Sequence, residues 1–226
     1  MRAGFELKMK DLVFVNFNVS AARLRKLVPE PLALDRPDGA TTDRAFVSAV
    51  SFRTTAIKFN GVRLPLPGYN QVNYRAYVRS TTGPTLWFLS IRPGSRLAAL
   101  SANLLGVPAK FERVSLVREQ DKDGPRIKVK SNGVAFSVTA LGEPARQSAF
   151  ITERPFGYIR GRGAILTIRA EHSKVGAVAA RADSVSAETF VRLGLLSEDE
   201  AARPESVYYA PGAAMLTSVT ETTRLG

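Results

Sequence analysis

The sequence contains no cysteine and a single histidine, His172. The absence of cysteine excludes disulfide bonds, thiolate nucleophiles, zinc fingers and iron–sulfur clusters. One histidine excludes a multi-histidine metal site, and a Ser-His-Asp triad would have to use that residue. No pair of carboxylates recurs at the spacing of metal ligands. We therefore predict that the chain uses no metal and no cofactor.

The sequence also lacks a long hydrophobic run. No stretch approaches the roughly 18 uncharged apolar residues of a membrane span. The segment Met1–Lys8 mixes charged with apolar residues, whereas a signal peptide has an uninterrupted apolar core. We therefore expect a soluble, cytoplasmic protein without a membrane span.

Acidic residues are scarce: 20 Asp and Glu stand against 32 Lys and Arg, which gives a net charge of +12. Such a surplus favours an acidic partner such as nucleic acid, anionic lipid or an anionic metabolite. The sequence has no Walker loop, no glycine-rich dinucleotide motif, no G-x-S-x-G elbow and no helix-turn-helix pattern. We therefore expect no specific nucleic-acid partner, and keep nonspecific binding to nucleic acid or an anionic surface as a weaker alternative.

The pattern that is present is typical of a mainly β protein. Short apolar or alternating segments are separated by turn residues, and no proline- or serine-rich linker divides them. We predict one domain, 1–226, of the α+β class, mainly antiparallel β and closed or nearly closed. The expected strands are 11–19, 45–57, 70–79, 85–91, 110–119, 126–131, 134–141, 159–160, 164–171, 207–210 and 214–220, and the expected helices are 21–28, 96–105 and 186–195.

The segment Asn70–Arg79 is the most informative of the expected strands. Because strand side chains alternate, Val72 and every second residue after it point to one side, and Gln71, Asn73 and Arg75 point to the other. The polar side either meets water, as is usual for a half-buried strand, or lines a polar pocket inside a barrel. Alternation alone does not choose between these two interpretations.

Four further residues are candidates for chemistry. A barrel interior would desolvate Lys110 and make its amine nucleophilic, although a lysine at a strand start is more often exposed. Glu153 and Arg154 precede an aromatic turn and either pair across the core or lie on the surface. His172 is a candidate general base, a structural hydrogen-bond partner or an exposed side chain.

A basic stripe, Arg126, Lys128 and Lys130, alternates with apolar residues. Such a stripe can contact phosphates. No aromatic residues interleave with it, as a platform for single-stranded nucleic acid requires. We favour a solvated strand face whose charges protect a sheet edge.

Several segments in a fixed order resemble the YqjF-like family of uncharacterised bacterial proteins, which belongs to the acetoacetate decarboxylase-like superfamily. The resemblance extends from about Leu12 to Val219. Within it, Asn73, Arg75 and Tyr77 match an N-x-R-x-Y strand. The segments are LPGYNQVNYRAYVR, GPTLWFLSI, GVPAKFERVSL, FITERPFGYI, AEHS and GLLSEDEAARPESVYYAPG.

The resemblance implies a cone-shaped antiparallel β-barrel with a few peripheral helices and an internal cavity. In the decarboxylase, the first lysine of a Pro-Lys-Lys motif forms a Schiff base with the keto acid. The matching stretch here is PAK, which places Ala109 at the nucleophile position and Lys110 beside it, on the opposite side of a strand. The acidic residue of the family's Tyr-Asn-Glu segment corresponds to Gln71, which follows Tyr69 and Asn70. We therefore expect no Schiff-base decarboxylase activity.

The leading hypothesis is a protein that binds a small organic anion in a barrel cavity. Arg75 would hold the anionic group, Tyr69, Gln71, Asn73 and Arg154 would contribute to binding, and Trp87 and Phe88 would supply apolar walls. The alternative is an enzyme of the lyase or hydratase type that acts on a carbonyl acid through Lys110, Glu153 or His172. Exposed edge strands also suggest self-association into a homo-oligomer.

Overall fold

The computed structural model describes residues 4–36, 43–145, 148–172 and 175–221, apart from the side chains of Ser148, His172 and Glu221. Within these ranges, the chain forms thirteen strands of one sheet and five short helices. The strands are β1 Phe5–Ser20, β2 Ala33–Leu34, β3 Arg44–Phe59, β4 Val62–Arg63, β5 Tyr69–Ser80, β6 Gly83–Pro93, β7 Ser115–Asp121, β8 Gly124–Lys130, β9 Ala135–Pro144, β10 Phe156–Arg160, β11 Ile165–His172, β12 Val178–Ser186 and β13 Ser206–Glu221. The helices are α1 Ala21–Arg25, α2 Arg96–Leu104, α3 Ser148–Thr152, α4 Glu188–Arg192 and α5 Glu198–Ala201. None of these helices is long and apolar enough to cross a membrane.

Seven strands form a closed, barrel-like ring. The order is β1, β3, β5, β6, β10, β11 and β13, and pairing between β13 and β1 closes it. The mainly β, barrel-like architecture expected from the sequence is confirmed. The expectation of a wholly antiparallel sheet is wrong at one place, because β6 and β10 pair in parallel. Leu86 pairs there with Gly157, and Trp87 pairs with Tyr158. A parallel pair requires a long crossover, which here carries the chain through β7–β9 and α3.

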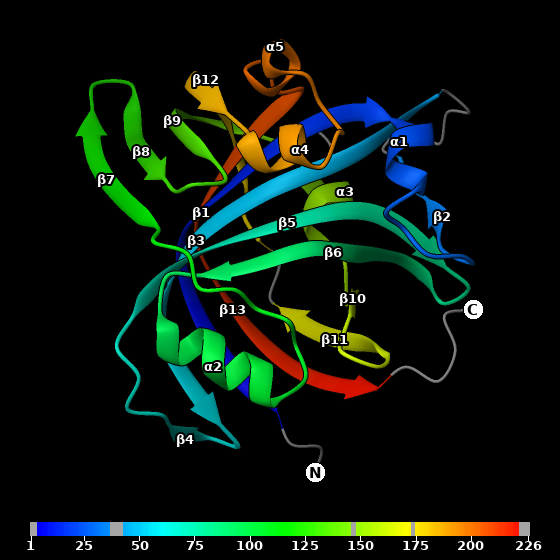
Figure 1. Cartoon of the computed structure of the whole chain (residues 1–226). Coiled ribbons are helices and arrows are strands. Elements are labelled where there is room, and N and C mark those ends of the chain that lie inside the picture. Colours follow the sequence, from blue (N-terminus) through cyan, green and yellow to red (C-terminus); the bar gives the residue numbers. More distant parts are fainter. Residues whose placement is uncertain (1–3, 37–42, 146–147, 173–174, 222–226) are drawn as a thin grey trace.

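The remaining long strands leave the ring at β13. There β12 pairs with the first half of β13, and β9, β8 and β7 follow in order. Figure 1 shows these strands together with α4 and α5 at one end of the molecule and α2 at the other. The largest apolar core lies against the outer face of the ring, and it includes Tyr74, Trp87, Ile127, Phe136 and Phe190.

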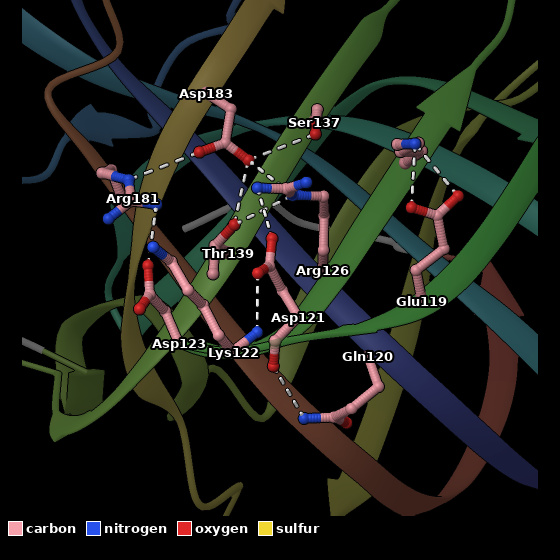
Figure 2. A network of polar contacts seen from close by, with 11 residues as sticks. Glu119, Gln120, Asp121, Lys122, Asp123, Arg126, Ser137, Thr139, Arg181 and Asp183 are labelled. Carbon is pink, nitrogen blue, oxygen red and sulfur yellow. Dashed lines mark hydrogen bonds and ion pairs between the residues drawn. The ribbon is translucent and has the colours of Figure 1, made fainter.

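Acidic partners neutralise two cations of the basic stripe on β8. Arg126 Nε lies 3.3 Å from Asp183 Oδ2, and Arg126 also pairs with Asp121 (Figure 2). Lys128 Nζ lies 2.8 Å from a carboxylate oxygen of Glu119. The expected sheet-edge position is wrong, because β8 lies between β7 and β9. The stripe is therefore part of a cross-strand ion-pair network.

The predicted helices form with shorter bounds. Helix α1 ends at Arg25, whose Nη2 donates to the carbonyls of Val28 and Pro29 and so holds the following residues in a turn. Helix α2 ends close to its expected limit, and Gly106 adopts a φ of +81°, which a residue with a side chain rarely adopts. The late helix shrinks to α4, and α3 and α5 have no counterpart among the predictions.

The strand expected at 110–119 begins only at Ser115. Before it, Asn103 Nδ2 donates to the carbonyl of Ala109 at 2.6 Å, and the Lys110 amide donates to the carbonyl of Ile91. These bonds tie the segment to α2 and β6, and an isolated bridge between Ile91 and Ala109 takes the place of a regular strand there. At the other end of the chain, the two strands expected at 207–210 and 214–220 form a single strand, β13.

Candidate functional site

The interior of the ring holds a cavity of about 300 Å³. Its wall is mainly apolar, and α2 closes part of one end through Ala98, Ser101 and Ala102. All seven ring strands contribute, because each turns alternate side chains inward. Examples from successive strands of the ring are Phe14, Phe52, Asn73, Phe88, Phe156, Ile168 and Met215.

Strand β5 carries the polar part of the cavity wall. Gln71, Asn73 and Arg75 line the cavity, whereas Val72 and Tyr74 lie fully buried in the outer core. The interpretation of a solvated polar face is therefore wrong: both faces of β5 are covered. Gln71 Nε2 donates to Asn73 Oδ1 at 2.7 Å, so the two amides form a fixed pair on the wall.

Arg75 lies at the end of this polar row, and its guanidinium is only partly satisfied. Nη2 donates to the Tyr77 hydroxyl at 3.0 Å and to the Ile151 carbonyl at 2.9 Å. The guanidinium carbon lies 5.3 Å from the ring centroids of both Phe14 and Tyr77. Nε is buried and has no hydrogen-bond partner within the described part of the chain. A buried donor without an acceptor costs free energy, and an anion in the cavity would supply that acceptor.

Arg154 is the second arginine of the cavity wall, and its side chain is 3% exposed. Nη1 forms an ion pair with Asp35 Oδ2 at 2.6 Å, and Nε donates to the Phe150 carbonyl at 2.8 Å. Burial lowers the pKa of Arg154, and the Asp35 carboxylate opposes that shift. Arg154 is thus neutralised by the protein, in contrast to Arg75.

Tyr69 begins β5 and also lines the cavity. Burial raises the pKa of its hydroxyl, which keeps it a neutral hydrogen-bonding group. Thr54, Thr152 and Thr217 add further hydroxyl side chains to the wall. The binding roles of Tyr69, Gln71, Asn73, Arg75 and Arg154 stay predictions.

Two of the three residues considered for catalysis, Lys110 and Glu153, do not line the described cavity. Ala109 lines the cavity, whereas the neighbouring Lys110 is exposed and does not. Glu153 is likewise exposed beside the inward-facing Arg154. The structure thus gives no support to Lys110 or Glu153 as groups that act in the cavity. The side chain of His172 lies outside the described residues, although its backbone pairs with Met215.

The aromatic walls also differ from the expectation in one respect. Phe88 lines the cavity, but Trp87 points into the outer core, as the alternation of β6 requires. Sequence reasoning missed Asp35, the partner of Arg154, because an isolated acid in a loop carries no motif. Among the described residues, no group of three or more His, Asp or Glu could hold a metal ion.

Comparison with known proteins identifies relatives of this chain. A family model described as an uncharacterized conserved protein, DUF2071, matches residues 6–214. The uncharacterized protein YqjF of Bacillus subtilis (strain 168) is 32% identical over 95 residues, which is 41% of this chain and 37% of that protein. The match to YqjF therefore spans well under two thirds of the relative's length.

Solved structures share the fold at low sequence identity. Acetoacetate decarboxylase from Legionella pneumophila superposes with a TM-score of 0.67 at 11% identity, covering 95% of this chain and 84% of that one. An acetoacetate decarboxylase-like enzyme from Sphingomonas wittichii RW1 gives 0.64 at 10% identity, covering 96% and 93%. The enduracididine biosynthesis enzyme MppR, complexed with pyruvate, gives 0.62 at 13% identity, covering 98% and 89%. The chain therefore belongs to the YqjF-like DUF2071 family of uncharacterised conserved proteins, and its fold is that of the acetoacetate decarboxylase-like proteins.

Proposed function

We propose that this protein binds a small organic anion in the ring cavity and that Arg75 holds the anionic group. The observation that carries the proposal is the buried, unpartnered Nε of Arg75 on a cavity wall. A guanidinium offers a carboxylate two parallel hydrogen bonds, and an apolar surrounding strengthens the attraction between the charges. The Gln71–Asn73 amide pair lies on the same wall and would orient the rest of the ligand.

The apolar residues of the cavity favour a ligand with an organic body over a bare inorganic ion. Phe14, Phe52 and Phe88 all border the cavity together with Arg75. A volume of about 300 Å³ lies at the small end of ligand pockets. MppR, which shares the fold, is complexed with pyruvate, itself a small organic anion.

The proposal includes the absence of Schiff-base decarboxylation. A Schiff base requires an amine in the cavity, and the residue that borders the cavity at this position is Ala109. Lys110 is exposed and does not line the cavity, so its amine does not face a ligand bound there. Binding, without covalent chemistry at this position, is the function that these residues support best.

Titration calorimetry with pyruvate, butanoate, hexanoate and benzoate, each beside its neutral amide, tests the proposal. We expect at least one carboxylate to bind more tightly than its amide. We expect Arg75→Met to weaken carboxylate binding about 10- to 100-fold, the worth of a charged hydrogen-bonded pair, with little effect on the amide. Arg203→Met, at an exposed arginine, is the matched control. Equal affinity for acid and amide, or unchanged carboxylate binding by Arg75→Met, would contradict the proposal.

A further inference from the structure

Helix α2 carries an apolar stripe on its outward side. Leu97, Leu100 and Leu104 are 50%, 57% and 80% exposed, while Ala98 and Ala99 are buried toward the protein. Residues spaced by three and four positions share one face of a helix, so the three leucines form a continuous surface, here called the α2 outer face. A surface helix normally turns polar residues outward, and a contiguous exposed apolar patch marks a site of interaction.

Phe111 enlarges the α2 outer face, since it is 42% exposed in the segment that follows the helix. The guanidinium carbon of Arg96 lies 5.3 Å from the ring centroid of Phe111, so a cation borders the aromatic part. Leucine, phenylalanine and arginine side by side are the composition of helices that lie in a membrane interface.

The charge around α2 is of one sign. Arg96, Lys110 and Arg113 are exposed and form no ion pair within the described part of the chain. The only acid between residues 83 and 118 is Glu112, which is buried. A second copy of this chain would bring the same cations to the contact, whereas an anionic surface would neutralise them.

The turn between β10 and β11 adds two more exposed cations, Arg160 and Arg162. The Leu166 side chain contacts both this turn and the end of α2. One of its methyl carbons lies within 3.4 Å of the position that a Cβ would take at Gly161, in the turn, and at Gly106, which follows α2. The turn is therefore adjacent to the end of α2. By contrast, Arg126 and Arg181, at the other end of the molecule, form ion pairs with Asp121, Asp183 and Asp123 (Figures 1 and 2).

We propose that the α2 outer face docks on an anionic lipid surface. Leu97, Leu100 and Leu104 would enter the boundary between headgroups and acyl chains, and the surrounding Arg and Lys side chains would contact lipid phosphates. The inner side of the same helix lines the cavity through Ala98 and Ala102, so docking brings the cavity wall to the membrane surface. This inference rests on α2 and its surroundings and is independent of what the cavity binds.

Sedimentation with vesicles tests the proposal on the whole chain. We expect binding to phosphatidylcholine vesicles that contain about one third phosphatidylglycerol, and little binding to phosphatidylcholine alone, because lipid charge supplies much of the attraction. The double variant Leu100→Gln/Leu104→Gln should lower the partition constant about tenfold or more, since it removes two apolar anchors without changing charge. Lys110→Gln should lower it about fivefold.

The matched control is Leu141→Gln/Leu193→Gln, which removes two exposed leucines from β9 and from the end of α4, far from α2. It should bind vesicles as the parent protein does, and thermal unfolding of both double variants checks that they fold. Failure of the parent protein to bind anionic vesicles would overturn the proposal, as would equal binding by both double variants. A dimer in sedimentation equilibrium that Leu100→Gln/Leu104→Gln converts to a monomer would also overturn it, because a second copy would then cover the face.

Discussion

Arg154 and Asp35 form a buried ion pair across 119 residues of chain, with Nη1 and Oδ2 2.6 Å apart. The pair ties the segment after α3 to the segment after β2. Arg79 Nη2 approaches the other carboxylate oxygen of Asp35 at 3.2 Å. Asp35 thereby neutralises Arg154, whereas Arg75, the other arginine of the cavity wall, has no acidic partner among the described residues.

Replacing Asp35 should destabilise the fold strongly. Asp35→Asn leaves the Arg154 guanidinium buried without its counter-charge, and breaking a buried pair costs about 3–5 kcal/mol of unfolding free energy. Urea unfolding of the variant measures that loss. Glu153→Gln alters an exposed acid nearby and should change the free energy by less than about 0.5 kcal/mol. Equal stability of the two variants would show that the Arg154–Asp35 pair contributes nothing.

Besides Tyr69, two further tyrosines should titrate at a higher pH than an ordinary tyrosine. Burial, aided by the charge of Glu112, raises the pKa of Tyr74 to about 12. Burial and the Asp11 carboxylate raise the pKa of Tyr209 to about 12 as well. The fold thus favours the neutral hydroxyls, while the unfolded chain ionises near pH 10.

The stability contributed by these hydroxyls should be fully present below about pH 10 and lost as the pH rises toward 12. Tyrosinate absorbance should show a second, later step, and Tyr74→Phe or Tyr209→Phe should shrink that step and flatten the alkaline fall in unfolding free energy. If all six tyrosines ionise together near their ordinary pKa, neither hydroxyl is held neutral by the fold.

Ala109→Lys should place an amine in the cavity. Ala109 is 5% exposed and borders the cavity, so the longer side chain extends into an apolar space that lowers the lysine pKa. Borohydride reduction in the presence of pyruvate should then modify the substituted position, as shown by peptide mass mapping. The parent protein should show only scattered surface modification. A single adduct at Lys110 in the parent protein would contradict the exposed position of that amine.

The alternation of Gln71, Asn73 and Arg75 could be read from the sequence, because strand geometry imposes it. Which face of β5 turns toward the cavity could not, since a strand has the same pattern whichever side the ring encloses. The family resemblance supplied the barrel-like architecture, and the comparisons confirmed it. The parallel pairing of β6 with β10 was missed, because it depends on strands far apart in the chain.

The ion pair between Arg154 and Asp35 could not be predicted from the sequence either. Arg154 stood out within its motif, but nothing local distinguished Asp35 from other loop acids, and only packing brought them together. The basic stripe was misplaced for a related reason. Its alternation indicated a strand, whereas its position inside the sheet depends on β7 pairing with β8 from outside.

By itself, the sequence determined what is local: where strands alternate, where α2 ends, and that alanine occupies the position before Lys110. These features follow from backbone geometry and residue identity. The tertiary structure alone decided which side of each strand faces the cavity, which arginine is neutralised and which helix face is left exposed. Those outcomes depend on contacts between distant segments, and no short-range pattern encodes them because the same local geometry is compatible with either side of a sheet.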